Sequence, residues 1–401
     1  MKNDGASIVA AARALEGEIA LTLSSLVRIR TPSCGEGEGI GYVAARMREI
    51  GFDEVRVDAM GNLIGRIGEG PVSIAFDAHI DVVDVTDAPA WLHPPFAGEV
   101  AEGEVFGRGA CDQKGAIAGL LAAARIMKSL DCLGGCAVHV VITVQEEDCE
   151  GLCWFHLIEE EGLKPDAVVL TEPSGLLIAR GQKGKVQMVV ETKGRASHGS
   201  APELGMNAIY AMAPIVSGVE RLNASLRPSP PLSKGSVTVS RIESRAPSLC
   251  SVAEECRIHL DRRLTRGETG ETALEEIRAI AAPRGGRVYV PRYERASWRG
   301  LVRGRELCYP SWLMPEDSPL VEAARAAHRD LFGRAGETLI WDFSTNGTAT
   351  AGIHAIPTIG VGPGDPRGAH IRDEHISLDQ CVAAAALYAA LPAHFAEGAR
   401  R

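Results

Sequence analysis

Two adjacent glutamates, Glu146 and Glu147, stand at the end of an apolar run, residues 138–144, that is rich in Val and Ile. This composition predicts a buried strand of a parallel sheet, and such strands end at the sheet edge where open α/β folds bind ligands. Neighbouring carboxylates that lose solvent repel each other, so one stays protonated unless cations lie close by. The pair therefore indicates a bound cation, a proton-transfer role, or both. A solvated acidic turn that continues through Asp148 and Glu150 is the alternative.

Metal-binding residue types recur at the predicted ends of other strands and in loops before helices. We expect five of them to meet at one sheet edge: His79, Asp112, Glu147, Glu172 and His370. Two imidazoles and three carboxylates suit a pair of divalent ions, most naturally zinc. Asp112 could bridge the pair, with one histidine and one glutamate completing each side. Glu146 is then the spare carboxylate that could act as general base for a metal-bound water.

The neighbours of these residues allow structural interpretations as well. His79 and Asp81 form a His-x-Asp pair on one face of a strand end, so we expect Asp81 to orient the imidazole; a purely structural pair is the alternative. Asp112 lies in a glycine-rich turn before an Ala-rich helix, where it could also cap that helix. A thiolate zinc site at Cys149 and Cys153 is disfavoured, because no second cysteine pair has matching spacing.

Strand and helix patterns alternate over residues 1–182 and resume over 298–401, which predicts a discontinuous α/β catalytic domain with a mixed sheet flanked by helices. Residues 183–297 show the order βαββαβ, which predicts an inserted ferredoxin-like α+β domain. The expected helices cover 6–30, 39–50, 114–129, 151–162, 201–222, 268–282, 318–332 and 377–391. The expected strands cover 53–57, 62–67, 72–77, 137–144, 167–171, 185–192, 235–243, 252–262 and 286–292.

The composition excludes several classes of protein. A chain of 401 residues is long enough for two domains, and its net charge of −10 argues against a nucleic-acid partner. No apolar stretch approaches the ~20 residues of a membrane span, and the N-terminus does not resemble a signal peptide, so we expect a cytoplasmic protein. The glycine-rich stretch 35–41 follows no clear strand and carries glutamates that would repel phosphate. It predicts a helix entry, which disfavours a nucleotide-dependent ligase or dehydrogenase.

The order and spacing of these residues resemble the acetylornithine deacetylase / succinyl-diaminopimelate desuccinylase / aminoacylase / glutamate carboxypeptidase family of metallopeptidases over nearly the whole chain. Within that family, the chain looks most like the selenium-metabolism-linked hydrolase branch. The stretches that carry this similarity are 76–81, 144–149, 171–173, 197–203, 261–265 and 344–347.

The resemblance implies an aminopeptidase-like di-zinc domain, sometimes active with cobalt, and manganese is a further possible metal. The insert would act as a dimerisation or lid domain of a homodimer. The implied activity is hydrolysis of an amide bond in a small molecule: an N-acyl amino acid, an N-carbamoyl compound or a dipeptide. A catalytically inactive or regulatory homologue is the alternative. Glu146 would be the general base, and His198 would reach the partner's active site to stabilise the oxyanion. Candidate substrate-binding residues are Asn207, Arg263, Asn346 and Gly347, for which interface or structural roles are the alternative.

Overall fold

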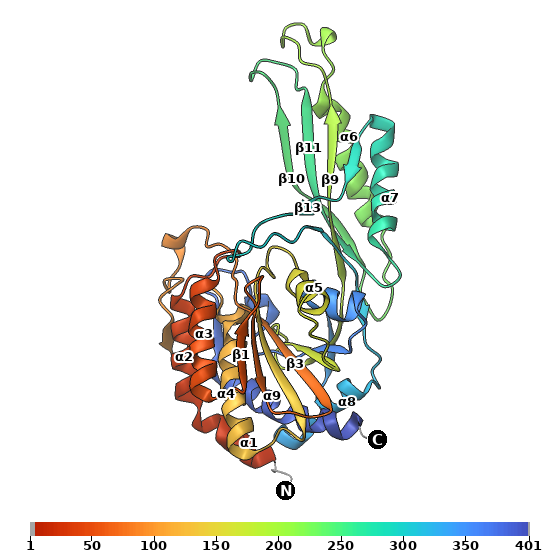
Figure 1. Cartoon of the computed structure of the whole chain (residues 1–401). Coiled ribbons are helices and arrows are strands. Elements are labelled where there is room, and N and C mark those ends of the chain that lie inside the picture. Colours follow the sequence, from red (N-terminus) through yellow and green to blue (C-terminus); the bar gives the residue numbers. More distant parts are fainter. Residues whose placement is uncertain (1–4, 400–401) are drawn as a thin grey trace.

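A mixed sheet lies at the centre of the larger part of the computed structural model, which describes residues 5–399 (Figure 1). In spatial order its strands are β1 (Glu54–Val57), β2 (Leu63–Ile67), β6 (Cys136–Thr143), β3 (Val72–His79), β7 (Ala167–Leu170), β18 (Thr358–Gly360), β8 (Ile178–Gln182) and β16 (Trp312–Leu313), with β17 (Thr338–Trp341) also paired to β8. Strands β6, β3, β7 and β18 run parallel. The last six residues of β3 are buried, as expected of a central strand covered on both faces.

Helices flank this sheet. They are α1 (Gly5–Ala14), α2 (Glu16–Arg28), α3 (Gly37–Ile50), α4 (Gly115–Leu130), α5 (Leu152–Glu159), α8 (Pro319–Phe332) and α9 (Leu378–Ala399). The Ala-rich α4 is buried along most of its length because it packs against both α9 and β3. Amphipathic α8 begins after Ser318, whose hydroxyl accepts a hydrogen bond from the Val321 N–H, and ends at the left-handed Gly333.

The smaller part projects from the larger one (Figure 1). Its elements are β9 (Gly184–Lys193), α6 (Ala208–Ser225), β10 (Ser236–Arg245), β11 (Glu255–Leu264), α7 (Gly270–Ala281) and β12 (Arg287–Tyr289). The strands form an antiparallel sheet in the order β10-β11-β9-β12, which is the ferredoxin-like arrangement. This part, which we call the insert, has its own apolar core. The division of the chain at residues 183 and 297 stays a prediction.

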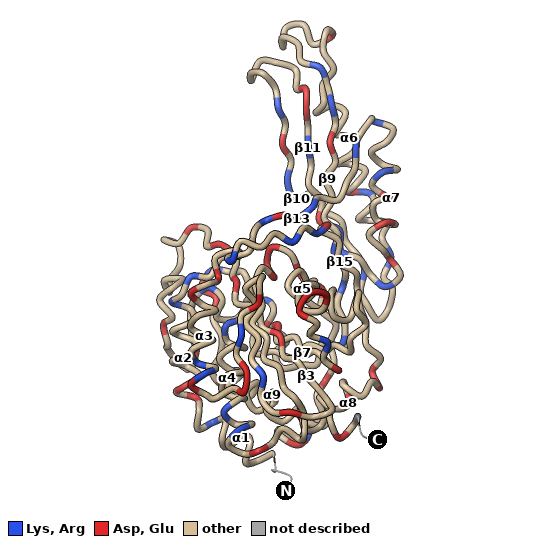
Figure 2. The backbone as a smooth tube through the Cα atoms, in the orientation of Figure 1, with Lys and Arg blue, Asp and Glu red and all other residues tan. Residues whose placement is uncertain are grey.

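Short strands complete the fold. They are β4 (Glu99–Ala101), β5 (Glu104–Phe106) and β19 (His375–Ser377) in one sheet, β13 (Arg292–Tyr293) and β14 (Arg305–Glu306) in another, and β15 (Cys308–Tyr309), which pairs with β9. Lys and Arg residues gather near β13 and β15, where the insert joins the larger part (Figure 2).

Some of the expected helices have other boundaries in the structure. The helix expected over 6–30 is two helices, because Leu15 has φ −94° and ψ 4° and interrupts the helical geometry. The helix expected over 201–222 begins only at Ala208, because the extended Asn207 caps it through a hydrogen bond from the Ile209 N–H.

The C-terminal helix is longer than the expected 377–391. It continues to Ala399 through Pro392, because Phe395 and Ala396 still bury their side chains against the core. None of the helices in residues 5–399 combines the length and the hydropathy that a membrane span requires.

Candidate active site

His79 is the last residue of β3, and its imidazole is buried at the carboxyl edge of the sheet. Its Nδ1–H donates to the backbone carbonyl of Asp81 at 2.9 Å, which leaves Nε2 to face Asp112 Oδ1 at 2.9 Å and Glu172 Oε1 at 3.7 Å. The Asp81 carboxylate lies 3.7 Å from Nδ1. The ring is therefore oriented by the carbonyl of Asp81 and not by its carboxylate, which corrects the role expected from the His-x-Asp pattern.

Asp112 lies between the two histidines that the sequence singled out. Oδ1 faces His79 Nε2, and Oδ2 faces His370 Nε2 at 3.2 Å. Glu147 Oε1 lies 3.0 Å from the same nitrogen of His370. Glu374 holds the Asp112 backbone in place, because its Oε1 accepts hydrogen bonds from the N–H groups of Cys111 and Asp112 at 3.0 Å each. One carboxylate thus contacts both imidazoles, as a bridging ligand would.

The two glutamates of the central pair have different surroundings. Glu147 pairs with His370, whereas the buried Glu146 has an Oε1 atom without a hydrogen-bond partner among the described residues. Burial, reinforced by the charge of Glu172, raises the pKa of Glu146 well above its usual range. Burial likewise raises the pKa of Glu172 far above normal. Glu146 therefore retains a free oxygen that faces the other acids.

The cluster is electrostatically suited to cations. Burial opposes the ionisation of Asp112, but hydrogen bonds with His370 and His79 outweigh it and hold its pKa below the usual range. Hydrogen bonds to Asp112 and Glu147 raise the pKa of His370 to about 10. Buried carboxylates crowded together require either protons or metal ions to offset their repulsion.

The ligand atoms of the cluster lie close enough together to share divalent ions. Ligand atoms of His79, Asp112 and Glu147 lie within 4.8 Å of one another, and so do those of His79, Glu146 and Glu172. Imidazole nitrogens and carboxylate oxygens are ligands that zinc accepts, and Asp112 is common to the surroundings of both histidines. The residues present therefore fit a pair of divalent ions.

Two buried carboxylates hold the backbone of the glutamate pair. Asp81 Oδ1 accepts from the Glu146 N–H at 3.2 Å, and its Oδ2 accepts from the Glu147 N–H at 3.1 Å. Glu36 Oε1 accepts from the preceding Gln145 N–H at 3.0 Å. Gln145 has a φ of 60°, a left-handed conformation that non-glycine residues adopt at a cost. Three successive N–H groups are thus fixed by two acids, and these contacts set the position of both glutamates.

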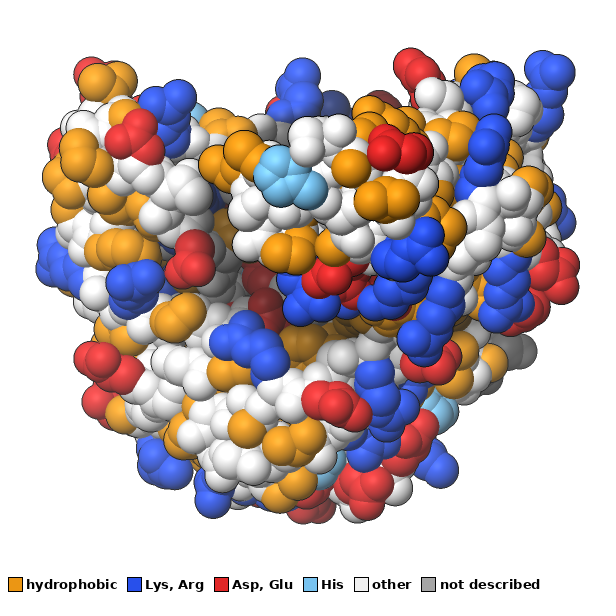
Figure 3. All heavy atoms as spheres, turned by 90° about the horizontal axis from the view of Figure 1, so that it is seen from above, with side chains coloured by type: hydrophobic (Ala, Val, Ile, Leu, Met, Phe, Trp, Pro, Cys, Tyr) orange, Lys and Arg blue, Asp and Glu red, His pale blue; other side chains and the backbone are white. Residues whose placement is uncertain are grey.

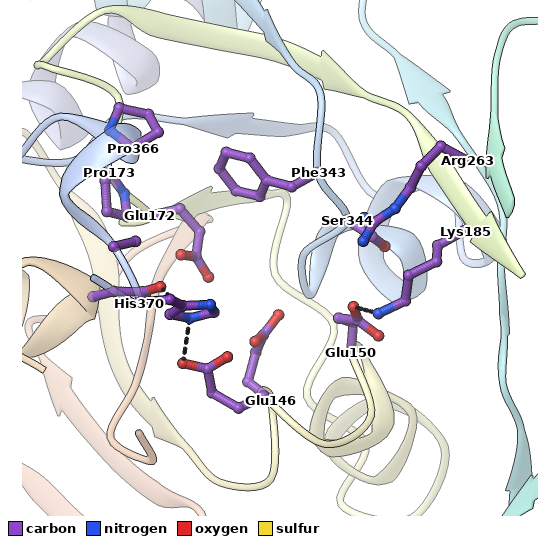
Figure 4. Close-up of a pocket in the computed structure, with 13 residues that line it drawn as sticks. Glu146, Glu150, Glu172, Pro173, Lys185, Arg263, Phe343, Ser344, Pro366 and His370 are labelled. Carbon is purple, nitrogen blue, oxygen red and sulfur yellow. Dashed lines mark hydrogen bonds and ion pairs between the residues drawn. The ribbon is translucent and has the colours of Figure 1, made fainter. Parts of the chain in front are cut away.

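A cavity of about 310 Å³ contains the cluster and continues between the larger part and the insert. Viewed from above, a hollow with acidic side chains in it is bordered by Lys and Arg (Figure 3). The close-up shows Glu146, Glu172 and His370 at one end of the cavity, and Lys185 and Arg263 at the other (Figure 4). Lys185 comes from β9 and Arg263 from β11, so the insert supplies the positive end.

The sequence predicted a site role for Arg263 but not for Lys185 or Glu150, which also line the cavity. Lys185 forms an ion pair with the buried Glu150 and lies over the ring of Tyr309, 5.0 Å from its centroid. Arg263 donates to both oxygens of Asp261, at 2.7 and 3.0 Å. The alternation of β9 could have indicated that Lys185 shares a face with other residues. It could not show that this face meets the cavity.

Two predicted substrate-binding residues make close contacts within the fold. The Asn346 side chain is buried and donates to Asp77 at 3.0 Å, while its oxygen accepts from the Gly151 N–H at 2.8 Å. Gly347 is packed so closely that a Cβ there would lie 2.4 Å from Trp312 Nε1. The amide is thus used within the protein, the glycine makes room for a tryptophan, and neither residue is part of the cavity wall. A role for them in substrate binding stays a prediction.

The other two predicted residues on the insert lie outside the cavity wall. Asn207 caps α6 with its side-chain oxygen. His198 is exposed and contacts Ser200 through Nδ1 at 2.7 Å. It follows the end of β9 opposite to Lys185, and at about 3.3 Å per residue the strand separates Lys185 from Lys193 by roughly 26 Å. His198 is therefore remote from the cavity of its own chain.

The cysteines beside the acidic turn are thiols that contact protein groups. The Tyr309 hydroxyl donates to Cys149 Sγ at 3.4 Å, and the Cys153 thiol donates to Asn346 Oδ1 at 3.2 Å. Burial raises the pKa of Cys149 to about 12 and that of Cys153 well above its normal value. Neither cysteine belongs to a group of three or more metal-ligand side chains among the described residues.

A mixed sheet with a histidine–carboxylate cluster at its edge and an inserted domain beside it defines a hydrolase of the metallopeptidase type. Residues 75–394 match the model of peptidase family M20/M25/M40, and the chain belongs to this family. It is 41% identical to the uncharacterized protein YgeY of Escherichia coli K12 over 387 residues, 96% of each chain. It is 29% identical to succinyl-diaminopimelate desuccinylase of Paracoccus denitrificans over 277 residues, 64% of this chain and 70% of that one.

The fold is also shared with a solved structure of the family. YXEP of Bacillus subtilis, described as a dinuclear metal-binding peptidase from the M20 family, superimposes with a TM-score of 0.68 and 17% identity, covering 95% of this chain and 98% of that one. At this identity the comparison establishes the common fold.

Proposed function

We propose that this protein is a metal-dependent amidohydrolase that uses two divalent ions, most naturally Zn²⁺, with Co²⁺ or Mn²⁺ as alternatives. The observation that carries the proposal is Asp112, which directs one oxygen to each of two histidines while Glu146 keeps an unpaired oxygen beside them. The substrate would be a small N-acyl amino acid, an N-carbamoyl compound or a dipeptide.

The donor set divides naturally between two ions. His79 and Glu172 would hold one ion, Glu147 and His370 the other, and Asp112 would bridge them. When bound, the ions would polarise the amide carbonyl and lower the pKa of a water molecule.

Glu146 is suited to move protons because it alone of the two adjacent glutamates has a free buried oxygen. It would take a proton from the attacking water and deliver it to the nitrogen of the leaving amine. General acid–base catalysis of this kind contributes typically ~10²–10⁴-fold in rate. Asp81 would act as a positioning residue, because its carboxylate accepts hydrogen bonds from the N–H groups of Glu146 and Glu147 and so fixes the position of Glu146.

The positive end of the cavity favours a substrate that carries a carboxylate. Arg263 uses Nε and one terminal nitrogen to hold Asp261, and its remaining terminal N–H groups could donate to the substrate carboxylate. Lys185 adds positive charge, although its ion pair with Glu150 offsets part of it. The amide would then lie between Arg263 and the acid cluster.

The insert would serve as a lid and as the dimer interface. Its strand β10 forms one edge of its sheet, and Ile242 on that strand is 57% exposed. Because His198 is remote from its own cavity, a role in oxyanion stabilisation requires a second subunit. Mixing a His198→Ala variant with a Glu146→Gln variant tests this role: activity recovered in mixed dimers supports it, and no recovery after verified subunit exchange contradicts it.

A hydrolysis screen tests the proposed function. The protein, reconstituted with zinc, cobalt or manganese, is offered N-acyl amino acids, N-carbamoyl amino acids and dipeptides, and release of the free amine is followed. Metal-dependent turnover of at least one class supports the proposal. Two bound metal ions per cavity without turnover of any class would instead indicate a protein that binds such compounds without cleaving them.

A further inference from the structure

A second group of metal-binding residue types lies outside the cavity described above. Asp58 is in the turn between β1 and β2, His156 is on α5, and Glu161 follows the end of that helix. Asp58 and His156 are buried, and Glu161 is partly buried. None of the three is among the residues that line the cavity within the described part of the chain.

The imidazole of His156 is directed between two carboxylates without bonding to either. Nε2 lies 3.8 Å from Asp58 Oδ2 and 3.7 Å from Glu161 Oε1. These separations exceed hydrogen-bond length, and Nε2 has no hydrogen-bond partner in residues 5–399, although His156 is only 4% exposed. A buried ring nitrogen without a partner is costly, so the arrangement calls for a ligand between the three side chains.

The separations are close to those of atoms that share one metal ion. With Zn–N and Zn–O bonds near 2.0–2.2 Å, two ligands of a tetrahedral ion lie about 3.3–3.6 Å apart. The ligand atoms of Asp58, His156 and Glu161 all lie within 4.8 Å of one another. A small contraction would bring the three onto a common ion, with water as a fourth ligand.

Hydrogen bonds already orient both carboxylates, as is usual around bound metals. Asp58 Oδ1 accepts from the N–H groups of Gly61 and Asn62 at 2.7 and 2.9 Å, and Oδ2 accepts from Asn62 Nδ2 at 2.8 Å. The other oxygen of Glu161 accepts from Arg56 at 2.5 Å. The guanidinium of Arg56 lowers the net negative charge near the three ligands, which favours a site of moderate affinity.

We propose that Asp58, His156 and Glu161 form an additional divalent-cation site, suited to Zn²⁺ by its one nitrogen and two oxygen ligands. The ion would join the β1–β2 turn to the C-terminal end of α5. Since α5 follows the acidic turn that contains Glu146 and Glu147, an ion bound here would stabilise the position of α5 and, through it, of that turn. It takes no part in the reaction, so the proposal does not depend on the proposed function.

Zinc content of the full-length protein tests the site. Wild type, His156→Gln and His354→Gln are loaded with zinc, freed of excess metal and analysed by mass spectrometry. His354 is a matched control, because its Nε2 also lacks a hydrogen-bond partner and lies 3.3 Å from Glu159 Oε1. We expect His156→Gln to hold about one zinc ion per chain less than wild type, and His354→Gln to match wild type. Equal zinc content in all three proteins, or an equal loss in both variants, would overturn the proposal.

Crystals give a second measurement that does not require a variant to fold. Anomalous diffraction from zinc-loaded wild type should show a peak between Asp58, His156 and Glu161. A zinc peak at the cavity with none at these three residues would refute the site. If His156→Gln does not fold, Glu161→Gln replaces it in the zinc analysis, since Glu161 is partly exposed and tolerates substitution better.

Discussion

Replacing Glu36 by Gln should change how the stability of the protein depends on pH. Glu36 is fully buried, and its Oε1 accepts hydrogen bonds from the N–H groups of Cys34 and Gln145, while Oε2 has no hydrogen-bond partner among the described residues. Burial, with the nearby charge of Asp81, raises the pKa of Glu36 from 4.5 to about 8. Gln keeps the acceptor for both N–H groups and removes the ionisation.

The magnitude follows from proton linkage. Because the folded-state pKa of Glu36 is raised, the folded protein binds the extra proton between pH 4.5 and about 8. Its contribution to stability is therefore fully present below pH 4.5 and is lost as the pH rises towards 8. With these two pKa values, the free energy of unfolding should fall by about 3 kcal/mol between pH 5 and pH 8 on account of Glu36 alone.

Urea titration followed by tryptophan fluorescence measures this effect in the larger part of the molecule. All five tryptophans lie outside the insert, at positions 91, 154, 298, 312 and 341. Wild type and Glu36→Gln are compared at pH 5 and pH 8 with the same metal content, so that other titrating groups cancel. The wild type should lose about 3 kcal/mol more than the variant on going from pH 5 to pH 8. The same pH dependence in both proteins would refute the reasoning about Glu36.

Three further changes have defined outcomes. Removal of metal with a chelator should abolish hydrolysis and lower the midpoint of thermal unfolding, because the buried carboxylates lose their counter-charges. Added zinc should restore the activity and the midpoint. Unchanged turnover in verified metal-free protein would contradict this prediction. Arg263→Ala should raise the KM of carboxylate-bearing substrates about 10–100-fold and alter kcat much less, because it removes a charge-assisted hydrogen bond of ~1.5–3 kcal/mol. An unchanged KM would show that Arg263 does not bind the substrate. Gly347→Ala should destabilise the larger part by about 1–3 kcal/mol, because the added Cβ would collide with Trp312. If the variant unfolds at the same urea concentration as wild type, Trp312 can move to accommodate the Cβ and the prediction is wrong.

The sequence was sufficient to predict that the residues of the acid cluster lie close together. His79 and Glu172 follow apolar strand patterns, and the carboxyl ends of parallel strands share one sheet edge, so their proximity could be predicted without coordinates. The βαββαβ order of the insert was likewise visible in its alternating and helical periodicities.

Contacts between distant segments could not be predicted in the same way. Glu36 was read only as part of a helix entry, because its hydrogen bond to Gln145 joins residues 109 positions apart. Asn346 was a candidate substrate anchor, and it lies in residues 344–347, one of the stretches that carry the family resemblance. Its burial against Asp77 depends on how that loop packs under the sheet edge, which no local pattern records.

The most direct test of the central claim is the turnover of Glu146→Gln at full metal content. The free buried oxygen of Glu146 is the feature that separates it from Glu147, which pairs with His370. With a substrate found in the hydrolysis screen, the variant should bind as much metal as wild type, show a similar KM, and lose about 10²–10⁴-fold in kcat. A fully metal-loaded Glu146→Gln protein that retained wild-type kcat would contradict the assignment of Glu146 as the proton carrier.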